Sequence, residues 1–310
     1  MALPTIVAQR SGLFYSQQRG GLPVIQDVHT FTGNVFFVMT GGSDTAGAGQ
    51  HPDSPFATID FAIGQCTANQ GDTILVMPGH TETISGAAGI ASDVAGVSII
   101  GLGHGAATPT VTWSATDSTW AISAGSSVIK NIRTTSSVNE CVSMFNITAA
   151  DVKLDKVDYV DPGSTKEAIQ FILTTNAADR LQILNSTLRQ ANAAAAAQLW
   201  IALVGPEDVE IGNCTAFLKL KDDATSSVIN ADTNVRQLYV HHLNGLMTGF
   251  SSGLLSFILG ASGATGTINH CNLAADVSAI TTINAFPSGY SFEVYASIVV
   301  DRNGKLDPVI

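Results

Sequence analysis

Ile183-Leu184-Asn185-Ser186 is one of eight copies of a short motif that returns between Val97 and Val299. Each copy starts with Ile, Leu or Val, its third residue is most often Asn or His, and the copies begin 30, 25, 29, 28, 29, 28 and 26 residues apart. The copies are Ile99–Leu102, Ile129–Ile132, Leu154–Val157, Ile183–Ser186, Ile211–Cys214, Val240–Leu243, Ile268–Cys271 and Val294–Ser297. A nearly constant period predicts a solenoid, because no copy can bury its apolar side alone.

The residues around each copy indicate strands. Leu199, Ile201 and Leu203 are apolar at every second place, and successive side chains of a strand leave opposite faces. The runs are about four to six residues long and end at Gly, Asn, Asp, Ser or Pro, as short strands between turns require. The same alternation predicts that Trp200 faces outward.

The period of 25 to 30 residues is too short for a propeller blade, which needs about 40–45 residues. It also lacks the leucine spacing and the helix of a leucine-rich repeat. A coil of three short strands fits the period, and parallel strands prefer a right-handed winding. Each coil then pairs with the next at about 4.8 Å, so equivalent residues form columns along the axis.

Three of these columns carry residues of interest. The third motif position gathers residues that tolerate the left-handed backbone of a sharp bend: Asn131, Asn185, Asn213, His242 and His270. One outward column is expected to contain Lys153, Gln182, Glu210 and Tyr239. The next outward column is expected to contain Lys130, Asp155, Leu184, Gly212 and His241.

The repeat resembles the right-handed parallel β-helices of the pectin-lyase-like superfamily. Ser54–Ile63 is similar to the short amphipathic helix that closes the N-terminal end of many such proteins, and Gly71–Glu82 is similar to the strand of their first coil. The chain departs from that pattern at His80 and Thr81, where a tyrosine is usual. The resemblance implies an all-β, single-stranded right-handed parallel β-helix of about eight or more coils.

Two regions are predicted. Residues 1–36 form an irregular docking arm, and residues 37–310 form the β-helix with a capping helix at about 57–68. The arm scatters apolar residues such as Phe14 and Tyr15 among Gly, Pro and Arg, and such a segment buries too little to order itself. Either neighbours in an assembly hold it, or it folds back along its own helix. We recognise no signal peptide and no membrane span.

Charge and cysteine content limit which partners and which covalent links are expected. Charged residues make up 13% of the 310 residues, and the formal net charge is −11 with 14 Lys and Arg, which argues against a nucleic-acid partner. Among the four cysteines, Cys214 and Cys271 share a column two coils apart, about 10 Å, whereas a disulfide needs Cα atoms within roughly 7 Å. We therefore expect buried thiols, and we assign no metal and no cofactor.

Carboxylates would indicate catalysis, because polysaccharide lyases and hydrolases share this fold. Asp155 and Glu210 are weak candidates, since neither outward column holds two carboxylates at the roughly 5–9.5 Å that glycoside hydrolysis needs. Scattered solvated charge is the favoured interpretation, and no catalytic residue is assigned. His242 and His270 are expected to stack in the turn column rather than to bind a metal.

Aromatic residues are the candidates for contact with a subunit or a glycan. Trp200 and Tyr239 are expected to be exposed on the wall, and Phe14 and Tyr15 belong to the arm. The subunit interface is the favoured interpretation, because Trp and Tyr are enriched there.

Two functions remain open. The favoured one is a non-enzymatic structural protein of a virus particle, a capsid decoration or tail-fibre component of a tailed bacteriophage. It would be made in the host cytoplasm, form a homotrimer through its β-helix and dock on other virion proteins through residues 1–36. The alternative is a polysaccharide-binding or polysaccharide-degrading enzyme, a phage depolymerase or lyase, whose glycan site lies on the outer wall.

Overall fold

The structure is a computed structural model. It describes residues 33–161, 163, 166–194, 198–221, 226–248, 254–275, 282–283, 291–295, 297–300 and 306–307. The chain divides into two units, Met1–Thr32 and Gly33–Ile310, and every described residue belongs to the second. Phe14 and Tyr15 therefore lie outside the described residues, and the docking arm stays a prediction.

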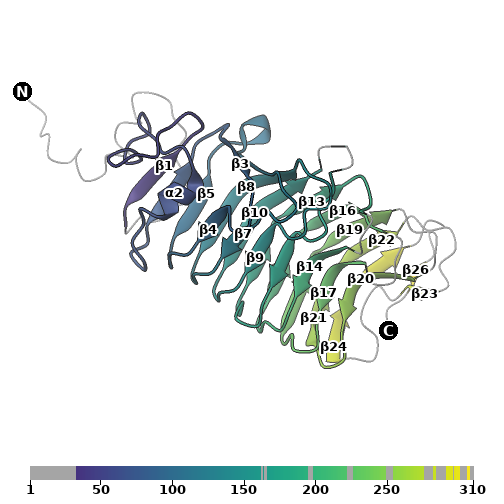
Figure 1. Ribbon diagram of the computed structural model, residues 1–310. Helices are drawn as coiled ribbons and strands as arrows, with labels where there is room; N and C mark the ends of the chain where they lie inside the picture. The colour runs from purple at the N-terminus through teal and green to yellow at the C-terminus, as the bar shows by residue number, and fades with distance from the viewer. Residues whose placement is uncertain are drawn as a thin grey trace, which may run out of the picture. The chain divides into compact units, whose positions relative to one another are not determined.

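The second unit is a parallel β-helix whose strands stack into three ladders along one axis (Figure 1). The first ladder contains β1 (Val35–Val38), β2 (Thr73–Val76), β5 (Ser98–Gly101), β8 (Val128–Ser136), β10 (Lys153–Val160), β12 (Gln182–Leu184), β15 (Glu210–Gly212), β18 (Leu238–His241), β21 (Thr265–Asn269) and β24 (Ser291–Tyr295). β8 and β10 are long enough to continue into the second ladder.

The other two ladders complete each coil. The second contains β3 (Thr81–Ile84), β6 (Thr110–Trp113), β13 (Thr187–Gln190), β16 (Thr215–Lys219), β19 (Asn244–Thr248), β22 (Asn272–Ala275) and β25 (Ile298–Val300), with β26 (Leu306–Asp307) added antiparallel. The third contains β4 (Ile90–Ser92), β7 (Trp120–Ile122), β9 (Phe145–Ile147), β11 (Ile172–Thr174), β14 (Leu199–Leu203), β17 (Ser227–Ala231), β20 (Leu254–Gly260) and β23 (Thr282–Ile283). The predicted fold class is confirmed, and the number of coils is close to the one expected.

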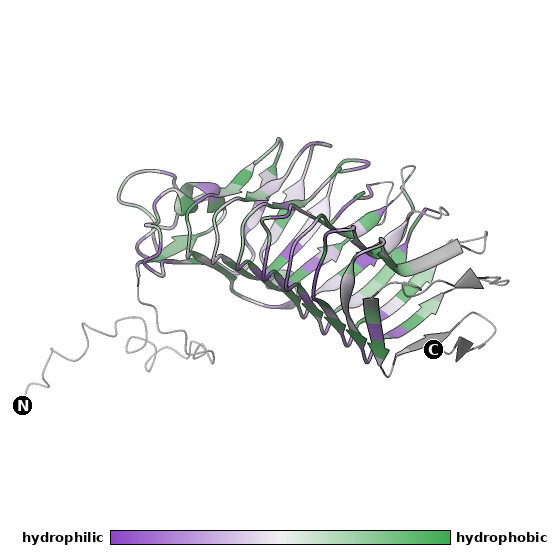
Figure 2. Cartoon of the chain, turned by 90° about the horizontal axis from the view of Figure 1, so that it is seen from below, coloured by the Kyte–Doolittle hydropathy of each residue, from purple (hydrophilic) through white to green (hydrophobic). Residues whose placement is uncertain are grey.

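The motif anchors form one continuous column inside the first ladder. Pairing runs without a slip from Ile99 to Val294, so all eight predicted anchors lie in register. From Ile99 to Ile268 these side chains are at most 2% exposed. Figure 2 shows the result as hydrophobic colour that recurs at equivalent places along successive strands.

The third motif position has the expected left-handed backbone in six of the copies. Asn131, Asn185, Asn213, His242 and His270 have φ between 49° and 55°, and Lys156 has φ of 56°. Asn and His tolerate this conformation better than most residues. Their presence at the third motif position therefore indicates the bend that directs the chain into the second ladder.

The core of the middle coils is a run of stacked aromatic rings. Phe145 lies 5.5 Å from Trp120 and 5.4 Å from Phe171, measured between ring centroids, and Trp200 lies 6.2 Å from Phe171 and 4.9 Å from Tyr159. All five side chains are fully buried. Rings at such separations gain from offset and edge-to-face contact in addition to their burial.

Trp200 therefore corrects a prediction, because the sequence alternation placed it on the outer wall. Both Trp200 and the next residue, Ile201, are buried. The Trp200 ring contacts Tyr159 and Phe171 inside the coil. The equivalent residues of the preceding coil, Phe171 and Ile172, are both buried as well, so two consecutive side chains enter the core at the start of this strand. Strict alternation does not hold there, and Trp200 is no longer a candidate for an interface or a glycan contact.

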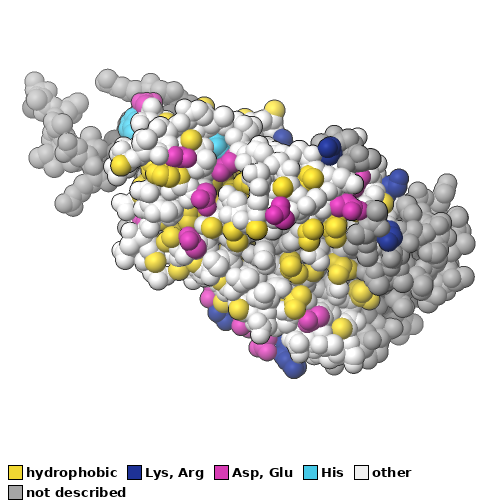
Figure 3. All heavy atoms as spheres, viewed as in Figure 1, with side chains coloured by type: hydrophobic (Ala, Val, Ile, Leu, Met, Phe, Trp, Pro, Cys, Tyr) yellow, Lys and Arg dark blue, Asp and Glu magenta, His cyan; other side chains and the backbone are white. Residues whose placement is uncertain are grey.

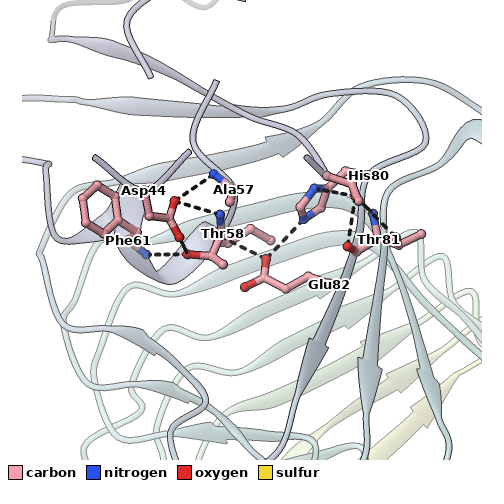
Figure 4. A network of polar contacts seen from close by, with 9 residues as sticks. Asp44, Ala57, Thr58, Phe61, His80, Thr81 and Glu82 are labelled. Carbon is pink, nitrogen blue, oxygen red and sulfur yellow. Dashed lines mark hydrogen bonds and ion pairs between the residues drawn. The ribbon is translucent and has the colours of Figure 1, made fainter. Parts of the chain in front are cut away.

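A short helix, α2 (Ile59–Ile63), closes the N-terminal end inside the predicted range. The Thr58 hydroxyl accepts a hydrogen bond from the Phe61 amide at 3.3 Å and so caps the helix. The Asp44 carboxylate accepts from the amides of Ala57 at 2.8 Å and Thr58 at 3.2 Å (Figure 4). These contacts fix the loop before the helix as well as its first turn.

A buried polar pair joins this helix to the first coil. Glu82 accepts a hydrogen bond from the Ile59 amide at 3.0 Å, and its carboxylate lies 3.2 Å from Nε2 of His80 (Figure 4). The Thr40 hydroxyl lies 3.4 Å from Nδ1 of the same ring. His80, the residue that departs from the family pattern, is thus fully buried between polar partners.

We expect Trp200→Ala to destabilise the protein by about 3–5 kcal/mol, because it opens a large cavity in the aromatic core. Tyr239→Ala removes a ring that is 39% exposed and should change stability by only about 0.5 kcal/mol. Urea unfolding followed by far-ultraviolet circular dichroism measures both. Equal effects of the two substitutions would contradict the inward position of Trp200.

Candidate functional site

The outer face of the first ladder carries the candidate site. Register pairs Gln182 with Glu210 and Glu210 with Tyr239, and it places His241 beside Gly212. The two outward columns predicted from the sequence are therefore confirmed. Because their residues alternate with buried anchors, the side chains of adjacent coils meet on the outside of the wall.

Glu210 is the centre of a polar cluster that spans three coils. Its carboxylate accepts a hydrogen bond from Nε2 of Gln182 at 2.8 Å and lies 3.1 Å from Nε2 of His241. Nδ1 of His241 lies 3.0 Å from Nδ1 of His242. The side chain of His241 is only 13% exposed, so the imidazole is held on both sides. We call Gln182, Glu210, Tyr239, His241 and His242 the Glu210 cluster.

Gly212 makes the contact between Glu210 and His241 feasible. A Cβ atom at Gly212 would lie 2.2 Å from Nε2 of His241, so any side chain there would displace the ring. His241 instead lies across the backbone of the preceding coil and reaches Glu210. The sequence placed these residues in neighbouring columns but did not reveal the contact. The feature that could have indicated it is Gly212, which follows Glu210 by two residues and pairs with His241 on the next coil.

Aromatic stacking extends the cluster along the wall. The ring of Tyr239 stacks on His241 with centroids 4.8 Å apart and planes 28° apart. His242 and His270 stack at 5.4 Å with planes 7° apart, as expected for neighbours in the turn column. Tyr239 faces outward as predicted, and its exposed side borders a hollow.

The hollow beside Tyr239 lies over β18 and β21 and has a volume of about 440 Å³. Its lining includes Tyr239, Gln237, Thr265, Thr267 and Glu293. Register places Thr267 beside Tyr239 and Glu293 beside Thr267, so the aromatic ring and the carboxylate stand two coils apart. We call this feature the Tyr239 hollow.

Tyr295 stands beside Glu293 at the edge of this region. Its hydroxyl donates a hydrogen bond to the Glu293 carboxylate at 2.8 Å, and its side chain is 53% exposed. This hydrogen bond to a carboxylate raises the pKa of Tyr295 above its usual value, because the neutral phenol is the form that donates.

The second carboxylate candidate, Asp155, is occupied elsewhere. It lies 3.5 Å from Nζ of Lys130 and accepts a hydrogen bond from Nδ2 of Asn185 at 2.7 Å. Asp155 pairs with Leu184, and Leu184 pairs with Gly212. Asp155 therefore lies two coils, about 9.6 Å, from the strand that carries Glu210. The structure thus gives Asp155 and Glu210 separate partners.

The chemistry available to the Glu210 cluster is correspondingly narrow. Both nitrogens of His241 already face partners, so the ring would have to rotate away from Glu210 or His242 before it accepted a proton from a substrate. Among the described residues, no three His, Cys, Asp or Glu side chains gather in a way that could hold a metal ion.

The cysteines do not contribute to the site. Cys141, Cys214 and Cys271 are buried thiols, and Cys66 is partly buried. Burial raises the pKa of Cys66 and Cys141 to about 12 and that of Cys214 to about 11. These thiols therefore stay protonated and unreactive near neutral pH.

Comparison with known proteins gives no family. No protein-family model matches the chain, and no curated protein matches it significantly. Within the described residues, no helix is both long and apolar enough to cross a membrane.

Several solved structures share part of the arrangement. One described as a rhamnogalacturonan lyase is 12% identical, with 90% of each chain covered and a TM-score of 0.43. A GH136 lacto-N-biosidase from Eubacterium ramulus is 9% identical, with 86% of this chain and 67% of that chain covered and a TM-score of 0.43. ORF18 of Geobacillus virus E2 is 10% identical, with 78% and 57% covered and a TM-score of 0.32. Likenesses at this level carry no argument for function, and the β-helix rests on the strand register above.

We expect the native protein at pH 8 to react with fewer than one thiol per chain in the time that the urea-unfolded protein reacts with all four. The thiolate is the reactive form, and burial suppresses it in the folded chain. A colorimetric disulfide-exchange reagent measures both rates. Rapid reaction of two or more thiols in the native protein would show that the core is open.

Proposed function

We propose that the chain is a non-enzymatic structural protein of a virus particle, a capsid decoration or tail-fibre component of a tailed bacteriophage. The observation that supports this most is the state of the outer wall. Each acid considered above is paired with side chains of the wall itself. Glu210 contacts Gln182 and His241, and Asp155 contacts Lys130 and Asn185. Such contacts between coils stiffen a solenoid.

The outer surface of the second ladder supports assembly through the β-helix. Its outward column runs Arg189, Phe217, Leu246 and Ala274 by register. Phe217 is 39% exposed, and the Arg189 guanidinium lies 4.8 Å from the centre of its ring. Leu246 and Ala274 are partly exposed, and a column of apolar side chains that reaches solvent beside an exposed aromatic ring suits an interaction surface. We call these four residues the assembly face.

The rest of the wall has the character of a surface made for packing. Charged residues are only 13% of the chain, and Figure 3 shows a face on which hydrophobic and acidic side chains are scattered among uncharged groups. Three copies that pack their assembly faces around one axis would form the homotrimer, and residues 1–36 would then dock it on other virion proteins.

We expect the protein to sediment at three times the chain mass of 32.2 kDa. Phe217→Asp should reduce that mass to one chain, because it removes the aromatic ring from the interface and puts in its place a carboxylate that must lose its water. Val142→Asp is the matched control, since Val142 is exposed and apolar but lies outside the assembly face. Analytical ultracentrifugation measures all three. A monomeric parent protein, or a trimeric Phe217→Asp, would contradict this proposal.

The alternative is a polysaccharide-binding or polysaccharide-degrading protein with its site on the outer wall. The Tyr239 hollow is the specific observation in its favour, because an exposed aromatic ring beside hydroxyl and carboxylate groups suits a sugar. Binding needs only this surface, whereas cleavage would also need a group that moves protons. Release of reducing ends from a bound glycan would therefore favour the enzyme.

A further inference from the structure

The Tyr239 hollow is an open depression that is large enough to receive a small ligand. Its volume of about 440 Å³ falls within the roughly 300–1,000 Å³ of known small-molecule sites. It opens on the outer face of the first ladder, where Tyr239 alternates with the buried residues Leu238 and Val240. A ligand there would meet the wall of the solenoid and leave its core unchanged.

The aromatic side of the hollow is fixed before any ligand arrives. Tyr239 stacks on His241, and His241 is held by Glu210 and His242 at 3.1 and 3.0 Å. A tyrosine with few rotatable bonds offers contact area at low entropic cost, and this one is further restrained by its neighbour. Its exposed π-face can pack against the aliphatic C–H face of a pyranose ring.

Polar groups line the rest of the hollow. Thr265 and Thr267 contribute hydroxyls, Gln237 contributes an amide, and Glu293 contributes a carboxylate. The Thr265 hydroxyl already accepts a hydrogen bond from the backbone N–H of Gln237 at 3.1 Å. An aromatic wall facing several hydrogen-bonding groups is complementary to a ligand with one apolar face and a rim of hydroxyls.

The charge of the site selects among such ligands. Glu293 is the one charged residue among those described as lining the hollow, and Glu210 adds a second carboxylate one coil before Tyr239. Arg236, on the neighbouring turn, lies 3.7 Å from Glu207 and lines a separate hollow. The chain as a whole has a net charge of −11, so the negative electrostatic potential at the hollow repels an acidic sugar.

We propose that the Tyr239 hollow binds an uncharged saccharide and discriminates against acidic ones. This inference rests on the glycan-binding alternative above and adds the class of sugar. Stacking on Tyr239 provides affinity, and Glu293 provides selectivity by accepting hydrogen bonds from sugar hydroxyls while repelling carboxylates. Stacking and hydrogen bonding require no bond cleavage, so such a site could belong to a binding protein or to an enzyme.

The test uses the full chain on a glycan microarray with neutral and acidic glycans, followed by calorimetric titration of the strongest neutral ligand. Tyr239→Ala is expected to weaken binding at least about tenfold, and Glu293→Gln to raise the signal of acidic glycans relative to neutral ones. Val142→Ala is the control: it shortens an exposed apolar side chain that lies outside both the hollow and the assembly face, and it should leave saccharide binding unchanged.

Three results would contradict the proposal. Preference for acidic glycans, absence of binding to any glycan, or equal binding by Tyr239→Ala and the parent protein would overturn the proposal. Circular dichroism spectra of the variants show whether they are folded, and Glu293→Gln tests selectivity independently of the tyrosine. Sedimentation of the same samples separates this result from the assembly proposal, because Tyr239→Ala leaves the assembly face intact.

Discussion

The structure depends on the vertical contact between identical positions in neighbouring coils. Each anchor of the first ladder packs between the anchors before and after it, and the strands pair in parallel at about 4.8 Å. Burying one such Ile or Leu contributes about 1.5–3 kcal/mol, while the backbone hydrogen bonds hold the register. A single coil has neither neighbour and would not be stable.

This register also creates the surface. Because side chains alternate, fixing the anchors inside places Gln182, Glu210 and Tyr239 in one row outside and Gly212 and His241 in the next. The contacts of the Glu210 cluster follow from that placement and from the missing side chain at Gly212. A slip of one residue would reverse every side chain and remove both the cluster and the Tyr239 hollow.

Much of this was predictable from the sequence, and the failures have physical causes. The anchor spacing, the outward columns and the stacked pair His242 and His270 follow from a constant period. Trp200 was misplaced because two consecutive residues, Trp200 and Ile201, enter the core at the start of β14. The contact of His241 with Glu210 was missed because alternation gives the face of a side chain but not its direction along the wall.

The register of the coils is the claim on which everything else rests, and pairwise disulfide formation tests it directly. Gln182→Cys with Glu210→Cys places two thiols in adjacent coils, within the roughly 4.4–6.8 Å between Cα atoms that a disulfide accepts. Gln182→Cys with Tyr239→Cys places them two coils apart. Mass-spectrometric mapping after mild oxidation should find the first cross-link and not the second. Efficient formation of the second, or failure of the first in the folded protein, would contradict the stacked β-helix.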